Sequence, residues 1–176
     1  VYDAAIRHSL RPDYALSGQQ ERAGYIPAFF CNVLDGVTAA APVHRALQPE
    51  QPVAREEVLS RLHRHFSLHQ YNREQGMEAL QANGQHGFLI AWPGIPTCTY
   101  ARLKNPDLVD LLLAAVSDDV VRSFDVSLLH RHVLDAAFDI PYDRQLYAES
   151  IVCTPDARDI FSRVQSQKAV GIFLHA

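Results

Sequence analysis

The stretch AFFCNVLDGVTAAAPV, residues 28–43, gives the clearest local indication of the fold. Two apolar runs, residues 28–34 and 37–43, are joined by Asp35 and Gly36. An Asp-Gly pair supplies the positive backbone φ angles that the type I′ turn of a two-residue hairpin needs. The stretch therefore predicts a β-hairpin.

Helical and strand-like patterns follow this hairpin without strict alternation. Apolar residues at helical spacing predict helices over residues 53–66, 72–82 and 125–138, and further helices that begin near Asn105 and Thr154. Strand-like runs occupy residues 66–70, 87–92, 97–103, 147–153 and 169–174. This order predicts an α+β fold with a mixed, largely antiparallel sheet that contains hairpins and is covered by helices. Because there is no repeat or break in composition, residues 1–176 are predicted to form a single domain.

Composition excludes several functional classes. The 176 residues carry 16 Lys+Arg and 20 Asp+Glu, a net charge of −4, which lacks the basic footprint of a nucleic-acid binder. No apolar run reaches the ~20 residues of a membrane span. The odd number of cysteines, Cys31, Cys98 and Cys153, argues against a secreted disulfide framework and predicts a cytoplasmic protein. We therefore expect no nucleic-acid partner and no membrane partner.

The nine histidines raise the question of a metal site. His63, His65 and His69 are close in sequence, but they lack the spacing of known zinc motifs, and no H-E-x-x-H occurs. We expect a solvated helix end there and no metal. His130 differs, because the spacing of the helix that begins at Asp125 places it on the packed side. It is either a core histidine with one hydrogen-bond partner or part of a site.

A second polar pair ends the predicted hairpin. His44 and Arg45 follow Pro42 and Val43 at the point where the apolar run stops. An arginine offers a planar fork of donors that fits phosphate or carboxylate, so the pair is a candidate anion site. The alternative is a polar strand terminus without function.

Two short segments resemble one protein family. Residues 125–130, DVSLLH, resemble the D-x-S-x-L-H signature of the bacterial and archaeal proteins grouped as domain of unknown function 1015. Residues 42–45, PVHR, resemble the P-T-H-R segment of that family, with Val43 in place of Thr. The predicted order of elements agrees with the family over nearly the whole chain.

This resemblance implies that the chain is the C-terminal half of a longer protein. Members of the family carry an Asp-Gly-His-His-Arg motif upstream, in a half that is similar to the ParB/sulfiredoxin-like fold. Some relatives of that half bind nucleotides or phosphorylate small molecules. The predicted helix over residues 1–10 has no N-cap, as expected for a fragment. We expect exposed apolar surface near Val1, Tyr2 and Ile6, covered by the upstream half or by a second copy.

Two functions are compatible with these residues and motifs. The first is a non-catalytic α+β module that completes or supports an upstream ParB-like half. The alternative is part of a nucleotide-dependent phosphotransferase, with an anion site at His44, Arg45 and His130. Asp125 and Ser127 would cap the helix beside that site. No catalytic residue can be named, and we expect no cofactor in this chain, although the intact protein could bind a nucleotide. We predict that His44 or Arg45 lies within one helix diameter, ~10–12 Å, of residues 125–130.

Overall fold

The computed structural model describes residues 42–48, 53–83, 85–112, 125–145, 150–166 and 169–175. Except for residues 42 and 43, the predicted hairpin lies outside these ranges. The predicted helix over residues 1–10, the apolar surface near Val1 and the side chain of Cys31 also lie outside the described residues. The predictions made for them stay predictions.

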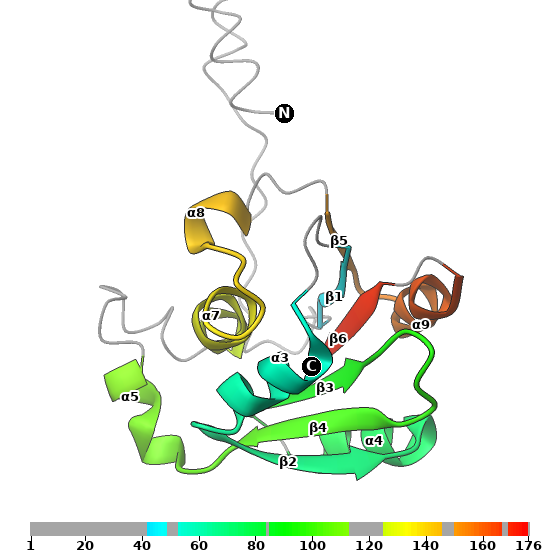
Figure 1. Cartoon of the computed structure of the whole chain (residues 1–176). Helices are drawn as coiled ribbons and strands as arrows, with labels where there is room; N and C mark the ends of the chain where they lie inside the picture. The colour runs from blue at the N-terminus through cyan, green and yellow to red at the C-terminus, as the bar shows by residue number, and fades with distance from the viewer. Residues whose placement is uncertain are drawn as a thin grey trace, which may run out of the picture. The chain divides into compact units, whose positions relative to one another are not determined.

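A six-stranded antiparallel sheet forms the centre of the described structure (Figure 1). Its strands lie in the order β2-β4-β3-β6-β1-β5, and every pair of described neighbours is antiparallel. The predicted α+β class is therefore confirmed. The strands are β1 His44–Leu47, β2 Phe66–Tyr71, β3 Gly87–Ala91, β4 Cys98–Leu103, β5 Ile151–Thr154 and β6 Val170–Leu174.

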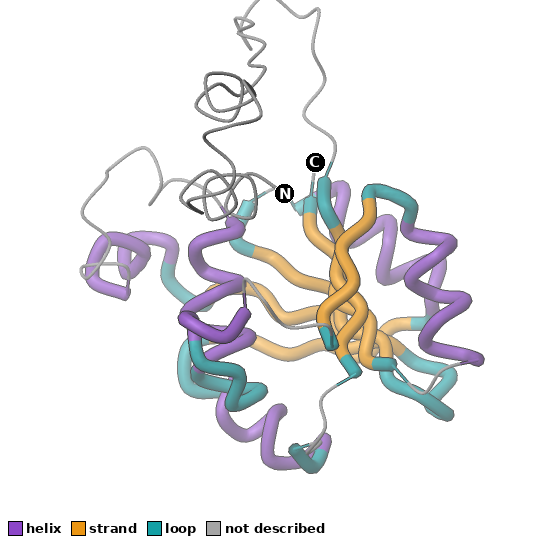
Figure 2. Tube along the Cα trace, turned by 90° about the horizontal axis from the view of Figure 1, so that it is seen from above, coloured by secondary structure: helices purple, strands orange, loops and turns teal. Residues whose placement is uncertain are grey.

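Helices cover both faces of this sheet (Figure 2). Their starts follow local sequence signals: Asn72 caps α4 by accepting a hydrogen bond from the backbone N–H of Gln75 at 2.9 Å, as its residue type favours. The helices are α3 Arg55–Leu62, α4 Arg73–Ala82, η3 Pro106–Leu108, α5 Val109–Leu112, α7 Asp125–Leu128, η4 Leu129–Asp135, α8 Tyr142–Gln145 and α9 Ala157–Ser166.

Two elements have a boundary that differs from the prediction by more than three residues. The helix predicted over residues 53–66 ends at Leu62, and Phe66 is the first residue of β2. Phe66 is fully buried against the ring of Phe88, with the ring centroids 6.0 Å apart. The packing of these two rings across the sheet outweighs the helical spacing of the local sequence. The strand predicted over residues 147–153 is described as β5, Ile151–Thr154.

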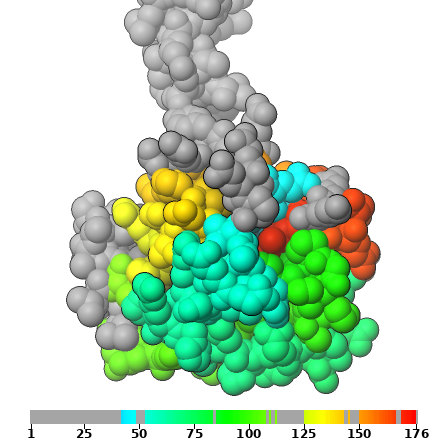
Figure 3. All heavy atoms as spheres, in the orientation of Figure 1, coloured from blue at the N-terminus to red at the C-terminus, as the bar shows by residue number. Residues whose placement is uncertain are grey.

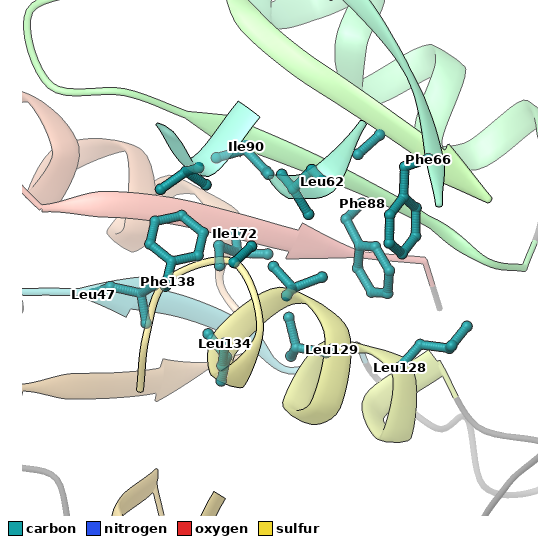
Figure 4. Close-up of a cluster of buried hydrophobic side chains, with 14 of the residues drawn as sticks. Leu47, Leu62, Phe66, Phe88, Ile90, Leu128, Leu129, Leu134, Phe138 and Ile172 are labelled. Carbon is teal, nitrogen blue, oxygen red and sulfur yellow. The ribbon is translucent and has the colours of Figure 1, made fainter. Parts of the chain in front are cut away.

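The two faces of the sheet carry separate hydrophobic cores. The core of one face joins strand residues such as Phe88 and Ile172 to α3, α7 and η4, as Figure 4 shows for ten labelled side chains. The core of the other face joins Leu89 and Phe173 to α4 and α9. Strand alternation explains this division, because neighbouring residues of a strand point to opposite faces.

The helix that follows Asp125 widens after its first turn. Residues 129–135 form a π-helix, in which hydrogen bonds span five residues instead of four. Examples are the bond from the Ala136 N–H to the Arg131 carbonyl, 3.1 Å, and the bond from the Phe138 N–H to the Val133 carbonyl, 3.0 Å. Such π-turns are rare and occur frequently at functional sites. This one contains His130.

Within the described ranges, no helix has both the length and the apolar character needed to cross a bilayer.

Candidate functional site

His44 and Arg45 are the first two residues of β1, not the last two of a strand as predicted. β1 is hydrogen-bonded on both sides, to β5 and to β6, and Arg45 is aligned with Cys153 on one side and with Ile172 on the other. These partners lie more than a hundred residues away along the chain, so the local pattern could not reveal them. The result is an arginine inside the sheet, only 8% exposed.

The guanidinium group of Arg45 donates hydrogen bonds to the backbone carbonyls of the two preceding residues. Its Nη1 donates to the Val43 carbonyl at 2.6 Å and, more weakly, to the His44 carbonyl at 3.4 Å. No carboxylate of the described ranges lies within ion-pair distance of it. Buried arginines are normally paired, because an uncompensated charge in a protein interior is costly. Arg45 is therefore a positive centre that a negative group would stabilise.

His130 lies in the π-helix, and Gln145 of α8 fixes its orientation. The Gln145 amide nitrogen donates to the carbonyls of His130, 3.0 Å, and Ile140, 2.7 Å. This arrangement turns the amide oxygen toward Nδ1 of His130. Because that oxygen can only accept, Nδ1 carries a proton. In the neutral ring, Nε2 is then a hydrogen-bond acceptor.

The electrostatics of His130 connect it to Arg45. Burial lowers the pKa of His130 below 6.5, and the positive charge of Arg45 lowers it further. The hydrogen bond to Gln145 opposes both effects, because it stabilises the protonated ring. The charge of Arg45 thus acts on His130, and the separation of ~10–12 Å expected from the sequence stays a prediction.

His44 points to the opposite face of the sheet. Its ring packs against Phe173, with centroids 5.3 Å apart, and its Nδ1 accepts a hydrogen bond from the Leu174 N–H at 3.2 Å. Burial and the charge of Arg45 lower the pKa of His44. The structure thus brings Arg45 and His130 to the face covered by η4 and places His44 in the other core. Anion binding by these residues stays a prediction.

Asp125 links the start of α7 to the start of β3. Its Oδ1 accepts from the backbone N–H of His86 at 2.8 Å and lies 2.9 Å from Nδ1 of the same residue. His86 has a positive φ of 66°, which brings both groups toward the carboxylate. The sequence predicts Asp125 as a helix cap beside a bound anion. However, the negative charge of its carboxylate would repel an anion at this helix start. Ser127, the second predicted cap, is buried. The candidate site therefore centres on Arg45.

The remaining histidines do not form a metal site in the part of the chain that the structure describes. There, no three His, Cys, Asp or Glu side chains converge. The rings of His65 and His132 meet edge to face, 5.7 Å between centroids, and His132 Nε2 lies 2.9 Å from the Leu112 carbonyl oxygen. Burial and the charges of His132, Arg64 and Lys104 lower the pKa of His65. Two titratable rings are thus held in contact.

Sequence reasoning missed Gln145 and His86. Gln145 belongs to no sequence motif. It lies in a helix of only four residues, which is too short for a periodic pattern of apolar residues to identify it. His86 follows Asn83 and Gly84, a pair that is typical of a helix end and does not indicate a functional residue. The one available signal was the Asp125 carboxylate, which needs a hydrogen-bond donor. The sequence does not show which residue supplies that donor.

Comparison with known proteins adds no further assignment. No protein-family model, no curated protein and no solved structure matches this chain. The resemblance to domain of unknown function 1015 therefore depends on its two short motifs and on the order of elements.

The fold is expected to lose stability as the pH falls below about 6.5, the ordinary pKa of histidine. The pKa values of His44, His65 and His130 are lowered in the folded protein. Below that pH the unfolded chain therefore binds more protons than the folded chain, so acid favours unfolding. Urea denaturation at about pH 7.5 and about pH 5.5 measures this effect as a lower midpoint in acid. Equal midpoints would contradict it.

Proposed function

We propose that this α+β domain is a non-catalytic module that holds an anionic group at Arg45 and His130, in support of an upstream ParB-like half. The observation that carries the proposal is the buried guanidinium of Arg45, for which the described residues provide no carboxylate. The two segments that resemble domain of unknown function 1015 contribute one member each to this pair. That coincidence supports the link between the pair and the family.

The chemistry of the pair suits an oxyanion. An arginine guanidinium gives two parallel N–H donors to a phosphate or a carboxylate. His130 is neutral near pH 7, because its pKa is lowered. A bound anion would offset the charge of Arg45 and favour the protonated ring, whose Nε2 would then donate a second hydrogen bond. Anion binding and protonation of His130 are therefore coupled.

A second function is nucleotide-dependent phosphoryl transfer by the intact protein. The same pair favours it, since a cation and a proton-sharing imidazole on one face can hold a transferred phosphate. The residues that would bind a nucleotide and activate an acceptor would have to come from outside the described ranges. Transfer of phosphate from ATP or ADP by the intact protein, lost in Arg45→Met, would establish this function over simple anion binding.

Arg45→Met is expected to weaken the binding of inorganic phosphate by at least tenfold. A hydrogen bond to a charged group contributes about 1.5–3 kcal/mol, and about 1.4 kcal/mol corresponds to a factor of ten. In the absence of phosphate, the same substitution is expected to raise the pKa of His130, because it removes a nearby positive charge. An NMR titration of the His130 ring, with and without phosphate, measures both effects.

Arg158→Met is the matched control. Arg158 is an exposed arginine at the start of α9, and its replacement should change neither phosphate affinity nor the pKa of His130. Phosphate that leaves the His130 resonances of the wild-type protein unmoved would contradict the proposal, as would equal phosphate affinity in Arg45→Met.

A further inference from the structure

A cavity of about 320 Å³ opens where β3 turns into β4. It lies between this turn, the first residue of α4 and the last turns of α9. In Figure 3 the turn (green) and α9 (orange to red) lie beside each other on the surface. The volume is at the lower end of the range for small-molecule pockets, about 300–1,000 Å³.

Most of the wall of this cavity is apolar. Ile95 and Pro96 come from the β3–β4 turn, while Phe161 and Val164 come from α9. The ring of Trp92 packs on the other face of the sheet, where it stacks on Phe138 and its Nε1 donates to the Thr99 hydroxyl at 3.2 Å. Gly94, at the rim, has a φ of 73°, and a Cβ added there would meet no atom within 4 Å. The cavity therefore has apolar sides and an open mouth.

Arg73 is the one cation among the described residues that line the cavity. The guanidinium carbon of Arg73 lies 3.8 Å above the centre of the Phe161 ring. This contact uses the flat face of the guanidinium and leaves its N–H edge available for a carboxylate. Among the described residues, no acidic side chain pairs with Arg73. Its charge reaches the cavity wall, because it lowers the pKa of the buried Cys98 thiol against the larger opposing effect of burial.

We propose that this cavity binds a small organic monoanion, a carboxylate with a branched aliphatic body. The carboxylate would accept from the N–H edge of Arg73, and the aliphatic body would contact Ile95 and Phe161. A site with a single cation beside apolar walls fits a ligand with one negative charge better than it fits a phosphate ester, which carries two. The site differs from the Arg45–His130 pair, which lies on the face covered by η4, whereas Arg73 and Phe161 belong to α4 and α9.

Isothermal titration calorimetry of the full chain gives a direct measurement, because it needs no fluorescent residue in the cavity wall. Titration with 4-methylpentanoate should give a saturable heat of binding. Acetate should bind far more weakly, since each buried methylene contributes about fourfold in affinity. The neutral analogue 4-methylpentanol should bind at least tenfold more weakly than the carboxylate, because it lacks the charge that pairs with Arg73.

Arg73→Gln tests the role of the cation, and Arg158→Gln on the exposed start of α9 is its control. Arg73→Gln should lose at least tenfold in affinity for 4-methylpentanoate, while Arg158→Gln should keep the wild-type affinity. No saturable signal with the carboxylate, or equal affinity for the carboxylate and the alcohol in the wild-type chain, would overturn the proposal. If Arg73→Gln fails to fold, the comparison of carboxylate and alcohol in the wild-type chain decides.

Discussion

Phe88→Ala is expected to lower the free energy of unfolding by about 3–5 kcal/mol, the range for removal of a buried aromatic ring. Phe88 is fully buried in β3, which lies between β4 and β6. Its ring meets that of Phe66 and belongs to the core that η4 covers (Figure 4). Because its neighbours come from a paired sheet and a packed helix, they cannot move to fill the space. Urea denaturation followed by circular dichroism measures the loss.

Ile95→Ala is the control for this substitution. Ile95 lies in the β3–β4 turn and is 37% exposed, so its truncation should cost less than about 1 kcal/mol. Similar losses for the two variants would show that Phe88 does not occupy the centre of a packed core.

Gln145→Ala is expected to destabilise the protein by about 2–4 kcal/mol, since a buried polar group left without a partner costs about 1–3 kcal/mol. The substitution removes hydrogen bonds to the carbonyls of His130 and Ile140 and to the ring of His130. It should also lower the pKa of His130 further, because the lost hydrogen bond favours the protonated ring. Urea denaturation and an NMR titration of His130 measure the two effects.

The two substitutions around His130 thus have opposite signs. Arg45→Met should raise the pKa of His130, and Gln145→Ala should lower it. Gln165→Ala, at an exposed glutamine of α9, serves as the control and should change neither stability nor the His130 titration. A shift of the same sign in Arg45→Met and Gln145→Ala would contradict the arrangement described for this site.

Elements whose signals are local could be predicted from the sequence. The pair β3 and β4 is joined by a Pro-Gly turn and pairs in antiparallel register, as expected for two apolar runs separated by turn residues. α4 begins after the cap Asn72, and α9 buries Ile160, Phe161 and Val164 at the predicted helical spacing. In each case the deciding residues are within a dozen positions of one another.

Features that depend on distant partners could not be predicted. β1 has four residues, and its position is determined by β5 and β6, which pair with it from the other end of the chain. Alternation along a strand separates His44 from Arg45, but only the topology decides which of them faces His130. The π-turn that carries His130 and the hydrogen bonds of Gln145 have no sequence pattern of their own.

The place of β6 in the sheet has a consequence for how the chain folds. β6 lies between β3 and β1, although it follows both of them in the sequence, and it aligns Phe88 with Leu174. During synthesis, the β2-β4-β3 part of the sheet can pair early, but the free edge of β3 stays open until β6 has been synthesised. β1 also stays unpaired until β5, about a hundred residues later in the sequence, has been synthesised. Such non-local closure is slow, on the order of milliseconds to seconds, and leaves aggregation-prone edges exposed to chaperones in the meantime.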